Sequence, residues 1–310
     1  MQIFYDLSPE QSNTAVALGF FDGVHRGHRK VLSPAANERQ NNLTPVCFTF
    51  AESPKSVIAG KELPMLMTRQ DKLTALTQIG IEHVYFADFR AMIHLSARAF
   101  FETVLINTLR ARQIFCGFNY RFGKNAEGDT ALLQALCDEY HVGLRVIPPE
   151  TDDGEVVCST LIKQLIAQGN VKRANALLCS RFGFEELITH GKHLGHKLGT
   201  PTINQPLVKG LAVPKFGVYA SVVTLENGEQ YCGVTNVGVK PTVDGTTPLW
   251  ETWMPDYHSG DLYGQTADIR LLDFIRDERK FDNLDELKAE ILKNSAQAKA
   301  IYQALLTTGL

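Results

Sequence analysis

The sequence predicts a two-domain protein, in which an α/β domain with a parallel sheet precedes a small antiparallel β-barrel or sandwich closed by C-terminal helices. The length of 310 residues exceeds what one ordinary core holds, and 44% hydrophobic with 21% charged residues is typical of a globular chain. The first half alternates strand-like and helix-like segments, as parallel sheets with right-handed crossovers require. After about residue 180 the chain turns to glycine-rich turns and short strands.

The elements of the first half follow in order along the chain. The apolar run Thr14–Leu18 is expected to be a buried strand, with a helix from Arg29 onward. Ser96 is a candidate N-cap for a helix over residues 96–112. A second helix is expected over residues 130–140, and further buried strands over residues 45–50, 83–88, 112–118 and 143–149.

The second half carries a hairpin signal. Asn227-Gly228 lies between two strand-like runs and predicts a two-residue turn with positive φ. Another strand is expected over residues 266–274. Asn283 followed by Glu286 resembles a capping box, so helices are expected from there to the C-terminus.

Composition excludes several classes of protein. Lysine and arginine number 31 against 34 acidic residues, and this net charge of −3 argues against a broad nucleic-acid surface. No apolar run is long enough for a membrane span, and the N-terminus lacks a secretion signal, so the cytoplasm is expected. The six cysteines contain no CxxC pair, which predicts reduced, buried thiols and neither zinc nor disulfides.

The stretch ALGFFDGVHRGH, residues 17–28, places two histidines where a strand passes into a helix. Open α/β sheets bind ligands beyond the carboxyl ends of their strands, and a helix N-terminus offers unpaired N–H groups to phosphate. His25 and His28 are three residues apart and point the same way, while Gly23 and Gly27 allow a close approach. A plain turn with two solvent-facing histidines is the alternative.

The motif GFFDGVHRGH resembles the nucleotidyltransferase signature of bacterial bifunctional riboflavin kinase/FAD synthetases. The resemblance spans nearly the whole chain, and implies a Rossmann-like FMN adenylyltransferase domain over residues 1–180 and a riboflavin kinase barrel over residues 181–310. Further blocks agree in order: FTFAESP (48–54), GFNYRFGKNAEGD (117–129), residues 158–178, LGHKLGTPTINQ (194–205), FGVYASV (216–222), GVTNVGVKPTV (233–243), WETW (250–253) and residues 274–291.

For the first domain, the resemblance implies transfer of the adenylyl group of ATP to FMN, giving FAD and pyrophosphate. His25 and His28 would hold the ATP phosphates, with Asn125 and Asp129 at the transfer site. Asp129 and Ser159 have structural alternatives as helix caps. The other residues matching the nucleotide site are Gly19, Phe21, Asp22, Gly23, Gly27, Ser159 and Thr160.

For the second domain, the resemblance implies phosphorylation of riboflavin by ATP and Mg²⁺. Glu251 matches the catalytic base, although from composition alone it is an ordinary strand carboxylate. Thr202 and Asn204 are oxygen ligands of the kind that suits a hard cation. The remaining expected contacts to nucleotide or flavin are Gly195, Lys197, Gly199, Arg276 and Lys280.

The chain departs from the family pattern at several positions. Leu161 stands where arginine is common, and Ala51 and Ser53 where an acid and a histidine are often found. His196 replaces a frequent arginine, and Trp253 a frequent histidine. Two other functions therefore stay open: a riboflavin kinase with a degenerate adenylyltransferase domain, and a flavin-binding regulator. The substrates are small molecules, and a homo-oligomer also stays open.

Overall fold

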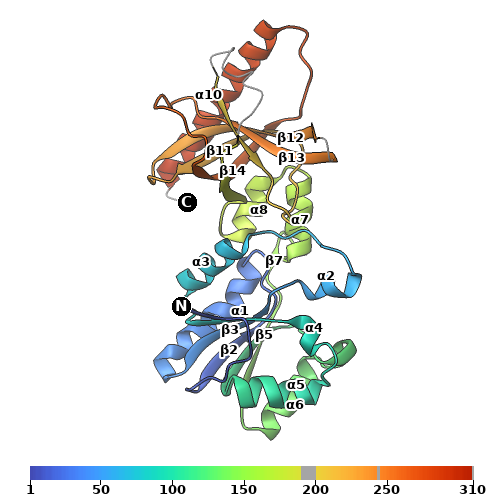
Figure 1. Ribbon diagram of the computed structural model, residues 1–310. Helices are drawn as coiled ribbons and strands as arrows, with labels where there is room; N and C mark the ends of the chain where they lie inside the picture. Colours follow the sequence, from blue (N-terminus) through green and yellow to red (C-terminus); the bar gives the residue numbers. More distant parts are fainter. Residues whose placement is uncertain (190–199, 243–244, 309–310) are drawn as a thin grey trace. The chain divides into compact units, whose positions relative to one another are not determined.

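The computed structural model describes residues 1–189, 200–242 and 245–308 (Figure 1). The chain divides into two compact units. The first unit contains Met1–Leu63 and Arg69–Ser159, and the second contains Pro64–Thr68 and Thr160–Leu310. The boundary predicted at residues 180 and 181 divides the chain by function, and it stays a prediction.

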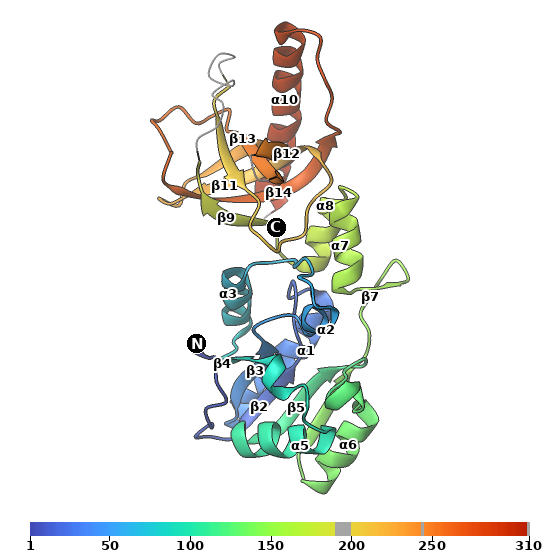
Figure 2. The same cartoon turned by 45° about the vertical axis from the view of Figure 1, so that its right-hand side comes forward.

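The first unit is built on a six-stranded parallel sheet, which confirms the predicted α/β class (Figure 2). The apolar run in front of the histidines forms the fully buried strand β2. In spatial order the strands are β1 (Gln2–Phe4), β4 (His83–Ala87), β3 (Thr44–Phe50), β2 (Thr14–Leu18), β5 (Ala111–Gly117) and β6 (Gly143–Ile147).

The strand order creates a switch point between β2 and β5. From β2 the chain runs to β3 and β4 on one side, and it returns to β5 and β6 on the other. The connections on the two sides therefore leave in opposite directions, and in open α/β sheets ligands bind at such a point, beyond the carboxyl ends of the two strands. The loops that carry the predicted phosphate-binding residues begin at these two strand ends.

Helices cover both faces of this sheet (Figure 2). Ser96 caps α5 by accepting from the Ala99 N–H at 3.1 Å, as predicted. One face packs on α5, η2 and α6 through a core that includes Phe101, Val104 and Leu133. The helical segments and the small hairpin of the unit are α1 (Arg26–Asn37), η1 (Glu38–Asn41), α2 (Pro54–Ala59), α3 (Arg69–Ile79), α4 (Phe89–Met92), α5 (Ala97–Phe100), the π-helical η2 (Phe101–Thr108), η3 (Lys124–Ala126), α6 (Thr130–Glu139), β7 (Thr151–Asp152) and β8 (Glu155–Val156).

The second unit contains a six-stranded antiparallel sheet that curls into a nearly closed barrel. Its two edges meet at Thr189 and Asn204, where the Thr189 N–H donates to the Asn204 carbonyl at 2.8 Å. Helices α7 (Ser159–Ala167) and α8 (Val171–Leu178) precede the barrel. In spatial order its strands are β10 (Thr202–Pro206), β13 (Gly245–Trp253), β12 (Gln230–Thr242), β11 (Gly217–Leu225), β14 (Thr266–Arg276) and β9 (Gly183–Leu187).

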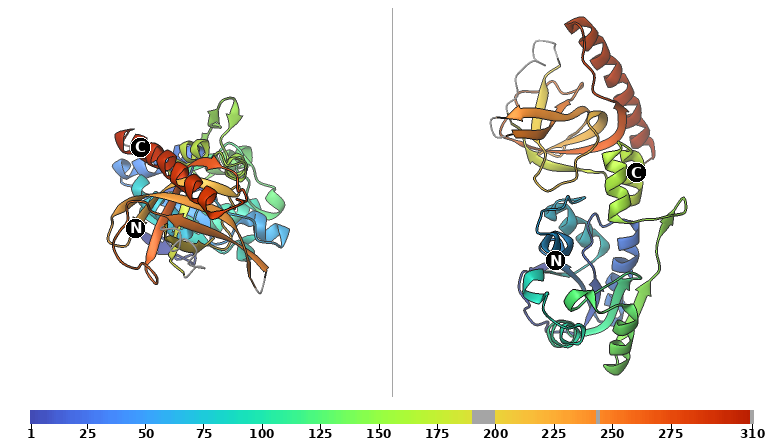
Figure 3. Two further views of the ribbon diagram at one scale, coloured as in Figure 1. Left: turned by 90° about the horizontal axis from the view of Figure 1, so that it is seen from above. Right: turned by 90° about the vertical axis from the view of Figure 1, so that its right-hand side faces the viewer.

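Helix α10 (Leu284–Thr308) lies along the barrel (Figure 3). Its start is capped as expected: the Glu286 N–H donates to Asn283 Oδ1, and Asn283 Nδ2 donates to the Glu286 carboxylate, both at 2.9 Å. It is one continuous helix where two helical segments were expected, and its Ala298 is buried in an apolar cluster with residues of β11, β12 and β14.

Two local expectations are wrong in detail. The hairpin at Asn227-Gly228 is present, but three residues separate Leu225 from Glu229, and only Gly228 has a positive φ, of 83°. Such a turn needs one left-handed position, which glycine supplies. Four cysteines are buried, whereas Cys158 is half-buried and Cys179 is exposed at the end of α8. All six are free thiols.

Two candidate active sites

His25 and His28 form a stacked pair at the start of α1. Their ring centroids are 3.5 Å apart with an interplanar angle of 20°. His25 is the N-cap residue, and its Nδ1 accepts from the His28 N–H at 3.4 Å. The helix therefore begins at Arg26, earlier than predicted. His25 is only 4% exposed, so the alternative of two solvent-facing histidines is wrong.

Burial keeps both imidazoles neutral at pH 7. It lowers the pKa of His25 to about 4. Burial also lowers the pKa of His28 well below its ordinary value, and the nearby His25 and Lys72 add to this effect. Because Nδ1 of His25 is an acceptor, its proton resides on Nε2, which can donate to a ligand oxygen. Nδ1 of His28 is buried and has no hydrogen-bond partner among the described residues.

The loop between β2 and α1 is strained and tightly packed. Phe21 and Val24 have positive φ values of 54° and 40°, which non-glycine residues rarely adopt. The Phe21 and His28 rings pack in a T-shaped arrangement, with centroids 5.3 Å apart. A Cβ at Gly19 would lie 2.8 Å from the Phe21 ring, and a Cβ at Gly27 would lie 3.3 Å from the His25 ring. A side chain at residue 19 would therefore displace the Phe21 ring, whereas one at residue 27 would press on the His25 ring by only a few tenths of an ångström.

The second predicted loop of this site follows β5. Asn125 is exposed with a positive φ of 55°. Asp129 caps α6 by accepting from the Leu132 and Ala131 N–H groups at 2.9 and 3.1 Å, which confirms its structural alternative. The Leu132 N–H, with help from Arg121, lowers the pKa of Asp129. Among the described residues, no hydrogen bond or ring contact joins Asn125 or Asp129 to the histidines; the adjacency of β2 and β5 places both loops at one sheet edge.

Ser159 is hydrogen-bonded to the backbone of the loop that carries the histidines. Its hydroxyl donates to the carbonyl of Asp22 at 2.9 Å, and α7 begins at Ser159 rather than at Thr160. Asp22 itself is buried, while Thr160 is exposed. Gly23, with a φ of 87°, supplies the left-handed position that lets the chain turn from Asp22 toward His25.

In the barrel, Glu251 lies at the centre of a row across three strands. It pairs with Asn204 on β10 and with Asn236 on β12. Directly opposed residues of antiparallel strands project from the same face of the sheet, so the three side chains share one face. Sequence reasoning missed Asn236, because only strand register reveals which residue lies beside Glu251.

Asn204 and Thr202 present oxygen atoms suited to a hard cation. Asn204 is 2% exposed, and its Oδ1 has no hydrogen-bond donor among the described residues. A buried acceptor of this kind is costly unless a partner binds it. No group of three or more His, Cys, Asp or Glu side chains suited to a metal occurs in the described part of the chain. The hydroxyl and amide oxygens of Thr202 and Asn204 are of the kind that Mg²⁺ accepts beside phosphates and water, so these two residues fit that ion by their chemistry.

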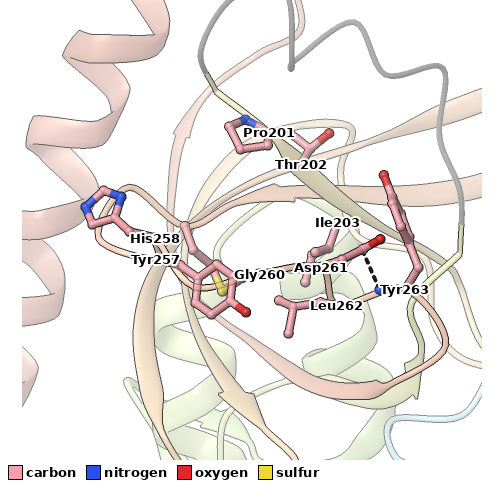
Figure 4. Close-up of a pocket in the computed structure, with 10 residues that line it drawn as sticks. Pro201, Thr202, Ile203, Tyr257, His258, Gly260, Asp261, Leu262 and Tyr263 are labelled. Atoms are coloured by element: carbon pink, nitrogen blue, oxygen red, sulfur yellow. Dashed lines mark hydrogen bonds between the residues drawn. The ribbon is translucent and has the colours of Figure 1, made fainter.

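A pocket of about 470 Å³ opens beside Thr202 (Figure 4). Asp261 lies in it and accepts from the Tyr263 N–H at 3.0 Å. Glu251 does not line it. Apart from Thr202, the residues of its wall were not among the predicted site residues. Most of them follow β13, where aromatic and small residues are close together in the sequence. The lining residues are Pro201, Thr202, Ile203, Met254, Tyr257, His258, Gly260, Asp261, Leu262 and Tyr263.

The remaining predicted kinase residues include Arg276, which has contacts in the structure, and Lys280, which is exposed. Arg276 forms an ion pair with Glu290 of α10 at 3.3 Å, and its guanidinium lies 5.6 Å from the Phe281 ring centroid. Burial lowers the pKa of Arg276. Lys280 is exposed. Gly195, Lys197 and Gly199, with the departure at His196, lie outside the described residues.

Comparisons with known proteins agree across both units. The FAD synthetase family matches residues 7–161, and the riboflavin kinase family matches residues 178–302. The chain is 34% identical over 295 residues to a bifunctional riboflavin kinase/FMN adenylyltransferase of Escherichia coli K12, with 94% of each chain covered. A protein of the same description from Bacillus subtilis strain 168 is 31% identical over 306 residues, with 96% of each covered.

A solved structure is similar over the same range. The crystal structure of a protein described as a macrolide-efflux protein from Streptococcus pneumoniae matches with a TM-score of 0.87 and 30% identity. The match covers 96% of this chain and 98% of that one.

None of the helices among the described residues has the length and apolar character needed to cross a membrane.

Proposed function

The chain belongs to the family of bifunctional riboflavin kinase/FMN adenylyltransferases and has both activities, and we propose that each of the two predicted domains performs one of them through the residues identified here. Residues 1–180 transfer the adenylyl group of ATP to FMN. Residues 181–310 phosphorylate riboflavin. The stacked, neutral His25 and His28 pair at the N-terminus of α1 is the observation that carries the first assignment.

Adenylyl transfer needs no protein nucleophile. A phosphate oxygen of FMN attacks the α-phosphorus of ATP, and the bond to the bridging oxygen breaks to release pyrophosphate. The protein's contribution is to position the phosphates and to stabilise the charge that develops on them. His25 Nε2 donates to a phosphate oxygen, and the N–H groups of Arg26 and Gly27, which have no acceptor within the helix at its first two positions, add to the same anion site.

The kinase reaction needs a base and a cation. Glu251 accepts the proton of the riboflavin 5′-hydroxyl while that oxygen forms a bond to the γ-phosphorus and ADP leaves. Thr202 and Asn204 would hold Mg²⁺, which neutralises charge on the ATP phosphates when bound. Thr202 also lines the 470 Å³ pocket, so a nucleotide held at Thr202 would extend into it. The aromatic side chains of Tyr257 and Tyr263 in the wall of this pocket are suited to the planar ring of that nucleotide.

Two substitutions test the assignment of separate sites. Glu251→Gln keeps the size of the side chain and should abolish FMN formation from riboflavin, while FAD formation from added FMN continues. His28→Ala should do the reverse. Glu229→Gln, on the exposed hairpin of the same barrel, is the matched control and should keep both activities. If either Glu251→Gln or His28→Ala removed both activities in a folded protein, the assignment would be wrong.

The partners, the cellular location and the oligomeric state of the protein stay predictions. The partners are small molecules and include no nucleic acid, which the net charge of −3 supports. The protein works in the cytoplasm. A homo-oligomer stays open, and sedimentation at several protein concentrations would determine the state of association.

A further inference from the structure

Lys72 is a buried lysine that the proposed chemistry does not use. On α3 it shares the buried face with Ala75 and Leu76, three and four residues further along, and it is only 4% exposed. Lysine is almost never fully buried unless its ammonium group has partners, because desolvation of the charge is costly. The partners of the Lys72 ammonium group therefore indicate which role this side chain has in the protein.

The Lys72 ammonium is directed at the loop that precedes the histidines. Its Nζ donates to the carbonyl of Phe20 at 2.8 Å and lies 4.4 Å from the centroid of the Phe20 ring. The hydroxyl of Thr49, fully buried on β3, donates to the same carbonyl at 3.0 Å. Two side chains from two different elements thus bind one backbone oxygen.

That oxygen belongs to the peptide plane that leads into the strained part of the loop. The next residue, Phe21, has the positive φ of 54°, and its ring packs against His28. A carbonyl fixed by two donors fixes the orientation of this peptide plane, and with it the direction of the Phe21 ring. The contacts therefore run from Lys72 and Thr49, through Phe20 and Phe21, to the stacked histidines.

We propose that Lys72 is a positioning residue for adenylyl transfer, which holds the Phe20 carbonyl, together with Thr49, so that His25 and His28 are fixed where the ATP phosphates bind. The proposal rests on the role assigned to the histidine pair. The role is one of positioning because the hydrogen bond of Lys72 goes to the backbone of the loop, at the Phe20 carbonyl, and not to either histidine.

The charge of Lys72 should give this role a pH dependence. Burial lowers the pKa of Lys72 to about 8; Cys47 and Asp22 oppose the shift and Arg69 adds to it. These groups and His28 are the titratable or charged side chains that act on it. Cys47 does not titrate in this range, because burial raises its pKa to about 12. As pH rises through about 8, the ammonium becomes a neutral amine and a weaker donor, so adenylyl transfer should decline.

The test compares Lys72→Met and Lys72→Arg with the unchanged enzyme. FAD formation from FMN is measured against ATP concentration between pH 6.5 and 9.5, and riboflavin kinase activity of each preparation serves as the internal control. Lys72→Met matches the volume and removes the donor, and should lower kcat/KM for ATP about tenfold to a hundredfold, the effect of one charge-assisted hydrogen bond. Lys72→Arg should restore part of the activity and abolish the decline above pH 8.

The outcomes separate the two proposals. If Lys72→Met folds and keeps the kcat/KM for ATP, Lys72 only fills space and the inference is overturned, while an inactive His28→Ala would still support the proposed site. If Lys72→Met does not fold, Lys72→Arg decides: a decline above pH 8 that persists in this variant overturns the inference. Thr49→Val removes the second donor and should lower kcat/KM in the same direction.

Discussion

Replacing Gly19 with alanine should disable adenylyl transfer and leave the kinase intact. The position has no positive φ, so its need for glycine comes from space alone. An added Cβ would lie 2.8 and 2.9 Å from two carbons of the Phe21 ring. Carbon atoms in contact ordinarily lie about 3.5–4.0 Å apart, so the ring must move by roughly 0.6 Å or more.

The Phe21 ring has little freedom to move. It is 2% exposed, and it packs at nearly a right angle to the His28 ring, with an interplanar angle of 85°. Overpacking of a well-packed core typically costs about 1–3 kcal/mol, and each kcal/mol lowers the melting temperature of a domain of about 150 residues by about 2–4 °C. Displacement of the ring also displaces His28, so the loss of FAD formation should exceed what the loss of stability explains.

The assay follows both activities and the melting temperature in one preparation. Gly117→Ala, where the nearest atom to the added Cβ is the Asn119 amide oxygen at 3.4 Å, is the matched control and should keep its melting temperature. Gly19→Ala with an unchanged melting temperature and unchanged FAD formation would refute the packing argument. A parallel loss of the kinase would refute the assignment of the effect to the first unit.

Three further predictions concern other parts of the chain. Trp250 is fully buried and packs on Phe184 with ring centroids 4.6 Å apart, so Trp250→Ala should cost about 3–5 kcal/mol and abolish the kinase, while calorimetry shows the first unit still melting normally. Burial lowers the pKa of His25 to about 4 in the folded protein, against the ordinary 6.5, so the unfolded chain binds a proton more readily and the folded state loses stability as pH falls from 6.5 toward 4. His25→Asn should make this loss smaller, measured as the urea concentration at the unfolding midpoint across that pH range. Leu161→Arg should raise kcat/KM for ATP about tenfold or more in a pyrophosphate-release assay, because arginine adds charge-assisted contacts to phosphate that leucine lacks; an unchanged rate would show that another residue of this chain already supplies them.

Local patterns were sufficient for most of the architecture. The buried strand at Thr14–Leu18, the cap at Ser96 and the capping box at Asn283 depend on residues close together in sequence, and each was predicted correctly. The details that differed depend on more distant contacts. The length of the turn at Asn227-Gly228 follows from the pairing register of β11 with β12, and the face of α10 that carries Ala298 is buried on strands far away in the sequence.

The sequence by itself determined the class of both units and the histidine motif, because hydrophobic period and short-range spacing are written in neighbouring residues. Only the tertiary structure placed Asn236 beside Glu251, the pocket beside Thr202 and the Lys72 ammonium on the Phe20 carbonyl. These groups lie on different elements, and Lys72 is 52 residues from Phe20. Strand register and helix packing decide such contacts, and a one-residue shift in either would remove them without changing any local pattern.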